Sequence, residues 1–371
     1  SNLSTGDVID FIMVFGNSLS AGTPTDATVT TAKLADSAVT YAKIGYNANQ
    51  FRNIIINGDM SIAQRSTSVS GANSSGYKSI DRYRHTISIG TWTISQSTDV
   101  PTGQGFAKSM KMDCTTAEAS PGSTDALAFV QKIEGQNLQY LKKGTSSAES
   151  LTVSFWVKSN KTGNAQVNLI DEDNTRMIGK QWSISSANTW EKKTLTFAGD
   201  TSGALGNDNG SSLRCEIWLD AGSDYKTGAT PTSWETLNSA DYFAGGTLNL
   251  GDNTANEIYI TGVQLEVGTA ASDFEFLPHD LNLQRCKRYF NAFFTENNMV
   301  IFQYQGGFRA LYYPYPIAMR TSPTLSVDTF VGFSAFNGSV ASTTGIYAYE
   351  NVSSTDTNTY AVGDCELDAE L

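Results

Sequence analysis

Apolar and polar residues alternate along several short segments of the chain, and this alternation is typical of β-strands with one buried face. In segment 151–158 the apolar residues Leu151, Val153, Phe155 and Val157 all fall on one face. Segment 213–220 alternates in the same way. Further strands are expected at 165–170, 191–197 and 257–267.

Turn-forming residues separate these strands, for example at 161–164 and 207–210. Many short strands with turns between them predict an all-β fold. The architecture that buries their apolar faces is two antiparallel sheets packed face to face, as a β-sandwich or jelly roll.

One segment after these strands has helical spacing. In 280–290 the residues Leu283, Lys287 and Phe290 share a helix face, and Asp280 is placed to cap the first turn. Aromatic-rich strands are expected at 289–315 and 325–360. A second, smaller β domain is therefore predicted at the end of the chain.

A ten-residue repeat precedes the strands, since residues 29–38 recur with changes as 39–48. Its apolar residues Val29, Leu34, Val39 and Ile44 are spaced by five, which matches neither one face of a helix nor a heptad. Such a strip becomes stable when strips from neighbouring chains close around a common axis. The repeat predicts an elongated homo-oligomer in which these four residues converge on a common axis.

These patterns predict four consecutive regions. Residues 1–20 are expected to end an upstream element, because the apolar segment 8–15 reads as the last strand of a domain that begins earlier. Residues 21–49 form a shaft or linker, 50–279 the jelly-roll sandwich, and 280–371 the distal β domain.

Composition excludes several classes of protein. The 371 residues include 32 Gly, 16 Tyr and 18 Phe, only 17% are charged, and the net charge is −12. A nucleic-acid surface needs clustered Lys and Arg, so nucleic acid is not an expected partner. No apolar run is long enough to span a membrane.

The reactive residue types give little support for catalysis. Cys114, Cys215, Cys286 and Cys365 have no zinc-ligand spacing, and buried free thiols are favoured over two disulfides. No nucleophile, metalloprotease or phosphate-loop motif is present. A pair of carboxylates meeting across a trimer cleft stays open as an alternative, since glycosidases need only that.

Trp156 and Trp218 are the first candidates for ligand contact. Each is out of phase with the apolar residues of its strand, so each ring is predicted on the outer face of its sheet. Aromatic faces bind the C–H surfaces of sugars. The competing interpretations are a subunit interface and burial beneath a loop. Trp182 is a further candidate, left open between core, rim and ligand contact.

Tyr312, Tyr313 and Tyr315 form a second aromatic candidate. Adjacent residues of a strand point to opposite sides, so at least one ring is expected at solvent or at an interface. Tyrosine suits adaptable recognition. An aromatic trimer core explains the cluster equally well.

Several phrases of the sequence resemble the tail fibre and receptor-binding proteins of bacteriophages. They are the opening phrase 53–65 followed by 79–83, the closing phrase 261–268 with 274–276 and 283–290, the distal phrase 319–324, and more weakly the repeat 29–48. The phrases occur in the order found in that family and span most of the chain.

The resemblance implies a homotrimeric virion fibre, attached to a tail adaptor or other virion protein at its N-terminal side. Its distal domains would contact a host surface polysaccharide without catalysis. The alternatives are a depolymerase spike and a purely structural virion appendage.

The middle domain, through the phrases 154–158 and 190–194, is also similar to carbohydrate-binding jelly rolls. Many of these hold a structural calcium ion through an acid in the closing strand. Here that strand has Thr261 and Gly262 instead, so calcium is not favoured. The acids of 171–174 could also hold calcium, but their spacing differs from that of a calcium loop and an ordinary turn is preferred.

Overall fold

The computed structural model describes residues 29–30 and 51–371, except 294–298, 301, 305–307, 332–337 and 352–359. The chain divides into two units between Ala48 and Asn49, and nearly all described residues belong to the second unit. Leu34, Val39 and Ile44 lie outside the described residues, and Val29 is 48% exposed in the single chain. The convergence of the repeat on an axis stays a prediction.

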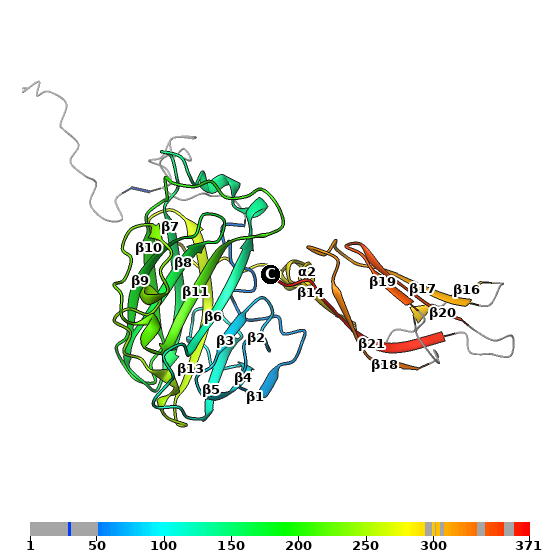
Figure 1. The fold of residues 1–371 in the computed structure, drawn as a ribbon, viewed down its shortest axis with the longest axis horizontal. Helices are drawn as coiled ribbons and strands as arrows, with labels where there is room; N and C mark the ends of the chain where they lie inside the picture. The colour runs from blue at the N-terminus through cyan, green and yellow to red at the C-terminus, as the bar shows by residue number, and fades with distance from the viewer. Residues whose placement is uncertain are drawn as a thin grey trace, which may run out of the picture. The chain divides into compact units, whose positions relative to one another are not determined.

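Two antiparallel sheets form the body of the second unit (Figure 1). The six-stranded sheet has the order β1-β4-β5-β13-β7-β10. Its strands are β1 (Ser68–Ala72), β4 (Thr91–Ser97), β5 (Ser109–Thr116), β13 (Glu257–Val267), β7 (Leu151–Ser159) and β10 (Glu191–Phe197).

The seven-stranded sheet has the order β12-β9-β8-β11-β6-β3-β2. Its strands are β12 (Glu235–Thr236), β9 (Arg176–Ile184), β8 (Gly163–Asp171), β11 (Ser211–Ala221), β6 (Ala126–Glu134), β3 (Arg84–Ile87) and β2 (Gly76–Tyr77). Consecutive strands such as β7 and β8 lie in different sheets, as in a jelly roll.

The two sheets share one core. Phe155 of the six-stranded sheet packs edge-on against Trp182 of the seven-stranded sheet, with ring centroids 5.1 Å apart. His85 of β3 lies against Met110 of β5, with Nε2 3.3 Å from Sδ. The predicted all-β sandwich and its five strands are confirmed, and β10 and β13 have the expected bounds.

The closing strand β13 carries a bulge between Thr261 and Gln264. Gly262 has φ +64, a region that L side chains rarely adopt. A Cβ there would lie 2.5 Å from Cζ of Phe106. Glycine in this phrase is therefore explained by backbone conformation and packing.

The predicted helix is present as α2 (His279–Lys287), with two corrections. Pro278 occupies the N-cap position and no side chain caps the helix, so Asp280 lies in the first turn. The helix ends at Lys287, and Phe290, expected on the helix face, begins β14 (Phe290–Phe293). Among the described residues, no helix has the length and apolar character needed to cross a membrane.

The C-terminal region contains two further antiparallel sheets. In one, β14 and β15 (Met299–Val300) flank β21 (Tyr360–Asp368), which also pairs with β18 (Thr324–Val331). The other has the order β16 (Phe302–Tyr304), β17 (Phe308–Pro314), β20 (Gly345–Asn351) and β19 (Gly338–Ala341). The expected strand content after α2 is confirmed.

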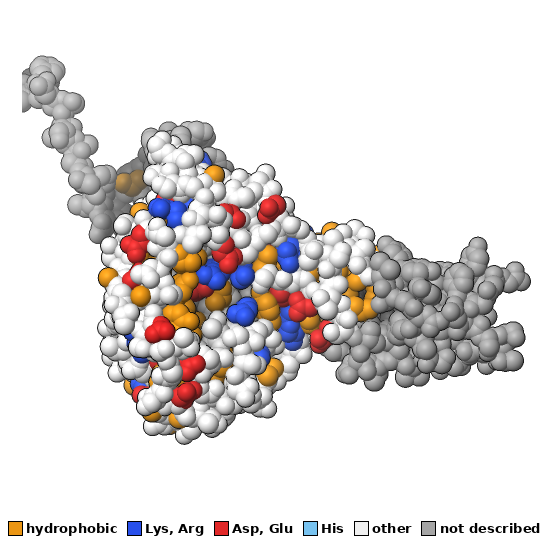
Figure 2. Space-filling model, in the orientation of Figure 1, with side chains coloured by type: hydrophobic (Ala, Val, Ile, Leu, Met, Phe, Trp, Pro, Cys, Tyr) orange, Lys and Arg blue, Asp and Glu red, His pale blue; other side chains and the backbone are white. Residues whose placement is uncertain are grey.

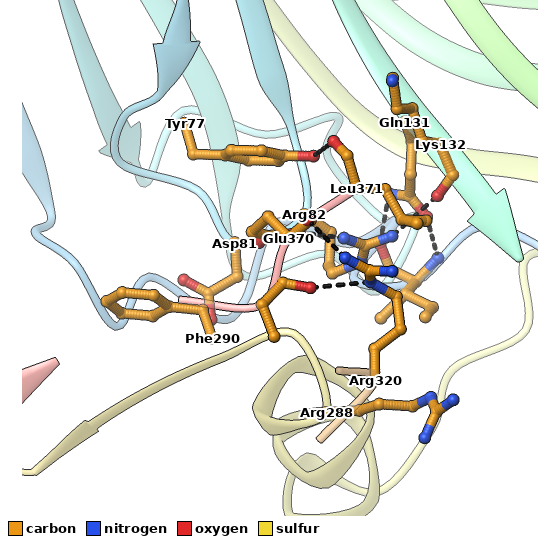
Figure 3. A network of polar contacts seen from close by, with 12 residues as sticks. Tyr77, Asp81, Arg82, Gln131, Lys132, Arg288, Phe290, Arg320, Glu370 and Leu371 are labelled. Carbon is orange, nitrogen blue, oxygen red and sulfur yellow. Dashed lines mark hydrogen bonds and ion pairs between the residues drawn. The ribbon is translucent and has the colours of Figure 1, made fainter. Parts of the chain in front are cut away.

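The last residues of the sequence pack against the sandwich. Glu370 forms ion pairs with Arg82 and with Arg65, and Tyr77 donates a hydrogen bond of 3.0 Å to the carbonyl of Leu371. Figure 3 shows the guanidinium groups of Arg82 and Arg320 next to Glu370, whose carbonyl accepts from Arg320 at 2.9 Å. These contacts attach β21 to the body.

Candidate functional site

A pocket of about 510 Å³ opens where β6, α2 and the segment before β1 meet. Two short 3-10 helices after β6 complete its wall, η2 (Gly135–Asn137) and η3 (Gln139–Leu141). The lining includes aromatic rings, side-chain amides and basic groups. Its main polar and aromatic members are Phe51, Asn53, Lys132, Gln136, Tyr140 and Arg285.

The aromatic rings are held at the pocket by hydrogen bonds of the backbone that carries them. Gln139 donates to the carbonyls of Gly135 and Gly206 at 2.9 and 2.8 Å, which fixes the 3-10 turn that carries Tyr140. Across the pocket, the backbone N–H of Phe51 donates to Glu275 at 2.7 Å. Tyr140 is 46% and Phe51 52% exposed, so both rings offer free surface.

Two of the basic residues at the pocket are already paired with acids. Arg82 is 1% exposed, forms an ion pair with Glu370 and lies 3.4 Å from the ring centre of Tyr289. Arg288 makes two hydrogen bonds to Glu134, at 2.8 and 2.7 Å. Burial raises the pKa of Glu134, but the hydrogen bonds from Arg288, Tyr289 and Gln136 and the charge of Arg288 together outweigh it and hold that pKa below its usual value.

Arg285 differs from these two. Its Nη2 lies 3.5 Å from the carbonyl of Asn53, and its buried Nη1 has no acceptor among the described residues. Burial lowers the pKa of Arg285. A guanidinium in this state has unused hydrogen-bonding capacity at the pocket.

No carboxylate and no histidine is among the described residues that line the pocket. Among the described residues there is also no group of three or more His, Cys, Asp or Glu that could hold a metal ion. The lining offers aromatic rings for stacking, amides for hydrogen bonds and positive charge.

The residues predicted from the sequence lie elsewhere. Trp156 is half-buried on β7, where it pairs in register with Lys192 and Thr261 on the outer face of the six-stranded sheet. That face also carries Trp190 packed against Tyr259, with ring centroids 6.3 Å apart. The predicted outward direction of Trp156 is confirmed, and its role as a ligand contact stays a prediction.

Trp218 is covered by a loop, one of the interpretations left open. Its ring stacks on Tyr242 with centroids 5.1 Å apart and an angle of 11°, and it touches Tyr225 at 5.2 Å. With 5% exposure it offers no surface to a ligand. The proposed glycan contact at Trp218 is wrong because the segment after β11 folds back over the ring.

Trp182 and Tyr315 are likewise interior residues. Trp182 is 5% exposed in the sandwich core, where it packs against Phe155. Tyr315 is 8% exposed and packs with Met319, Ile346, Leu367 and Ala369 in the C-terminal region. As ligand contacts both predictions are wrong. Tyr312 and Tyr313 belong to β17, but their side chains lie outside the described residues.

The acidic turn 171–174 is neutralised by the protein itself. Asp171 is fully buried and pairs with Lys143, whose Nζ is also 3.0 Å from Asp200. Glu172 lies 3.4 Å from Arg214. Asp173 accepts from the backbone N–H of Gly206 at 2.8 Å. Repulsion between the acids is relieved without a bound ion.

The side chains of three cysteines are described, and they are free and buried as predicted: Cys114, Cys215 and Cys286. Cys365 belongs to β21, but its side chain lies outside what the structure describes. Burial raises the pKa of the Cys215 thiol to about 12, so this group is unreactive at neutral pH.

The sequence patterns did not predict the pocket, although some of its residues lie in or next to phrases that the sequence singled out. Arg285 and Arg288 fall within the phrase 283–290 that carried the family resemblance, and Phe51 closely precedes the opening phrase. Two positive charges spaced by three, at Arg285 in α2 and at Arg288 directly after it, were the available signal. Nothing in the sequence indicated that residues 136–140 would face them.

Strand order and core define an all-β protein with a jelly-roll sandwich body. No protein-family model and no curated protein matches the chain. The fold is similar to the enzymatically active domain of tailspike protein 4 of bacteriophage CBA120, with 15% identity over 59% of this chain and 22% of that chain, and a TM-score of 0.31.

Two other solved structures show the same level of similarity. TmCBM61 in complex with β-1,4-galactotriose has 8% identity over 58% of this chain and 99% of that chain, with a TM-score of 0.30. A cyclase from Fischerella sp. TAU has 11% identity over 59% and 98%, with a TM-score of 0.32. These similarities do not assign a function, because the identities and TM-scores are low and the three proteins differ in kind.

Proposed function

We propose that this protein is a bacteriophage tail fibre protein that attaches the virion to a surface polysaccharide of the host. The observation that carries the binding role is the pocket beside α2, which presents two exposed aromatic rings together with amide and basic groups. This combination is suited to a sugar, whose C–H faces stack on aromatic rings while its hydroxyls take hydrogen bonds.

The proposed role is adhesion without catalysis. The described lining of the pocket supports it, since no carboxylate is present to act as acid, base or nucleophile on a glycosidic bond. A depolymerase spike is the alternative, and it would need a carboxylate pair elsewhere, for example between subunits. A purely structural appendage is the third possibility.

The proposed assembly is a homotrimer on a shaft formed by Val29, Leu34, Val39 and Ile44, joined to a tail adaptor at the N-terminal side. Three pockets on one fibre would engage one surface together. Millimolar contacts then gain strength because later binding events occur at high effective concentration.

Replacing Tyr140 with alanine tests the binding role. We expect Tyr140→Ala to weaken binding to bacterial surface polysaccharides on an array by about tenfold, which corresponds to about 1.4 kcal/mol for a lost stacking contact. Phe276→Ala is the matched control, because Phe276 is similarly exposed, at 49%, but does not line the pocket.

The other two functions give different results. Release of reducing sugars from a bound polysaccharide would identify a depolymerase. A protein that binds no polysaccharide, binds no cells and does not compete with virion adsorption would be a structural appendage, and the adhesion proposal would fall.

A further inference from the structure

We infer that the pocket selects acidic glycans, and that a ligand carboxylate binds at the guanidinium of Arg285. This inference rests on the proposed glycan-binding function and adds the chemical class of the ligand. It starts from a contrast in charge: the chain carries a net charge of −12, yet four basic residues and no described acidic residue line the pocket.

The acidic residues near the pocket already form ion pairs or hydrogen bonds with other groups. Glu370 pairs with Arg82, and Glu134 pairs with Arg288 through both of its oxygens. The two oxygens of Glu275 accept from the backbone N–H groups of Phe51 and Asn53, at 2.7 and 2.8 Å. Arg82 and Arg288, two of the four basic residues, are thereby paired. Glu275 acts on Arg285 through its charge, without an ion pair between them.

Arg285 is a basic residue of the pocket whose guanidinium lacks a full set of hydrogen-bond acceptors. It projects from the last turn of α2, and among the described residues it has no ion pair. Its buried Nη1 has no acceptor there, and its Nη2 makes a long hydrogen bond, 3.5 Å, to the carbonyl of Asn53. Burying a charged donor without an acceptor is unfavourable. A carboxylate is the group that a guanidinium binds best, through two parallel hydrogen bonds.

Other residues of the lining favour a carboxylate that is part of a sugar over a free carboxylate ion. Lys132 also lines the pocket and is only loosely paired, 3.7 Å from Glu172. Figure 3 shows Lys132 beside Gln131 on β6, above Arg82. Tyr140 supplies a stacking surface in the same lining, and Gln136 and Asn137 supply amides for hydroxyl groups. A uronic or other carboxylated sugar would use all three kinds of group at once.

Basic and acidic side chains are mixed on the face that Figure 2 draws, and the chain is acidic overall. Long-range attraction to the whole protein therefore does not favour an anion. Selection has to come from local pairing in the pocket, which is the part of the interaction least weakened by salt.

The experiment compares the full-length protein with polygalacturonate, alginate, hyaluronate and polysialic acid. Each polymer is also offered after chemical reduction of its carboxyl groups to alcohols, and a phosphate-bearing teichoic acid is included. We expect at least one acidic polymer to bind, and its reduced form to bind at least tenfold more weakly.

Arg285→Met should lose that preference and bind both forms with the low affinity of the reduced polymer. Lys192→Met is the matched control, because it removes the same charge from an exposed position on β10 outside the pocket and should leave the preference intact. Arg285→Lys keeps the charge without the bidentate geometry and should give an intermediate preference. It also serves if the Met variant fails to fold, which circular dichroism would show.

The outcomes separate the two proposals. Equal binding of acidic and reduced polymers, or of wild type and Arg285→Met, overturns the acidic selection and leaves glycan binding standing. Binding of the teichoic acid alone overturns the carboxylate assignment in favour of phosphate. Binding of no polymer, acidic, reduced or from bacterial surfaces, overturns the proposed function itself and the inference that rests on it.

Discussion

Buried charged side chains in this protein are mostly satisfied by partners far away in sequence. Lys143 is an example: its ammonium contacts Asp171 and Asp200 and also the carbonyls of Ser202 and Gly203, both at 2.9 Å. Two carboxylates and two carbonyls around one cation account for its burial. No local pattern pairs Lys143 with these residues, because the contact exists only once the strands are assembled.

His85 gives a pH-dependent prediction at the scale of a single residue. It is fully buried against Met110, and burial lowers its pKa to about 3. In the unfolded chain its pKa is about 6.5, so between about pH 6.5 and pH 3 the unfolded state binds a proton that the folded state does not bind. The free energy of unfolding therefore falls as the pH drops from about 6.5 towards 3.

Replacing His85 with leucine should remove this contribution. Between pH 7 and pH 5 we expect the free energy of unfolding of the wild type to fall by about 2 kcal/mol more than that of His85→Leu. Urea titrations at several pH values measure the difference. Burial raises the pKa of Asp81 to about 6, so Asp81 changes the free energy of unfolding in the opposite direction. This change is the same in both proteins and does not affect the difference between them.

His279 provides the control for this experiment because it is exposed at the start of α2. His279→Leu should leave the pH dependence of the wild type unchanged. If His85→Leu and the wild type show parallel curves between pH 7 and pH 5, His85 is not held neutral by the fold.

At the scale of elements, side-chain amides of the opening phrase 53–65 attach it to the sandwich. Asn53 accepts from the N–H of Leu265 at 3.1 Å and donates to the carbonyl of Val263 at 3.0 Å, which attaches the opening segment to β13. Asn57 donates to the carbonyls of Ile62 and Asp81. Side-chain amides thus replace strand pairing where the backbone turns.

The bulge in β13 gives a prediction at this scale. Gly262→Ala should destabilise the protein by about 1–3 kcal/mol more than Gly103→Ala, as measured by urea unfolding. Both glycines have positive φ, +64 and +77, so the backbone cost is shared. A Cβ at Gly262 meets Phe106 at 2.5 Å, whereas one at Gly103 has nothing within 4 Å.

Equal destabilisation by the two alanine substitutions would show that backbone strain alone explains the glycine. A larger effect at Gly262, with the Phe106 ring displaced, would confirm that this ring limits the space at the bulge.

At the scale of the whole molecule, the repeat 29–48 carries the proposed trimer. If its apolar residues meet on an axis, a charge at Leu34 would place three like charges together in a buried seam. We expect Leu34→Asp to convert a trimer into monomers in sedimentation experiments at micromolar concentration. Thr30→Asp is the control, since Thr30 is exposed and outside the apolar set.

A wild-type protein that sediments as a monomer would contradict the shaft. So would a Leu34→Asp variant that stays trimeric. The avidity in the proposed function depends on this result, whereas binding to a single pocket does not.

The sequence was sufficient for the all-β class and for five of the sandwich strands, β7, β8, β10, β11 and β13, but strands such as β6 and β9 were not predicted. Strands such as β7 and β10 were predictable because a half-buried strand must alternate, and that rule acts between neighbouring residues. Alternation also placed Trp156 on the outer face correctly. The helix α2 was found from its spacing, but its cap was not, because Pro278 rather than a polar side chain precedes it.

Only the tertiary structure decided what covers each face and where a pocket forms. The loop after β11 closes over Trp218, and the pocket brings together Tyr140 and Arg285 from distant parts of the chain. The periodicity of a strand fixes the side to which a ring points, because it follows from backbone geometry. Whether that side meets solvent, a loop or a ligand depends on contacts between distant segments, and these form only when the chain folds.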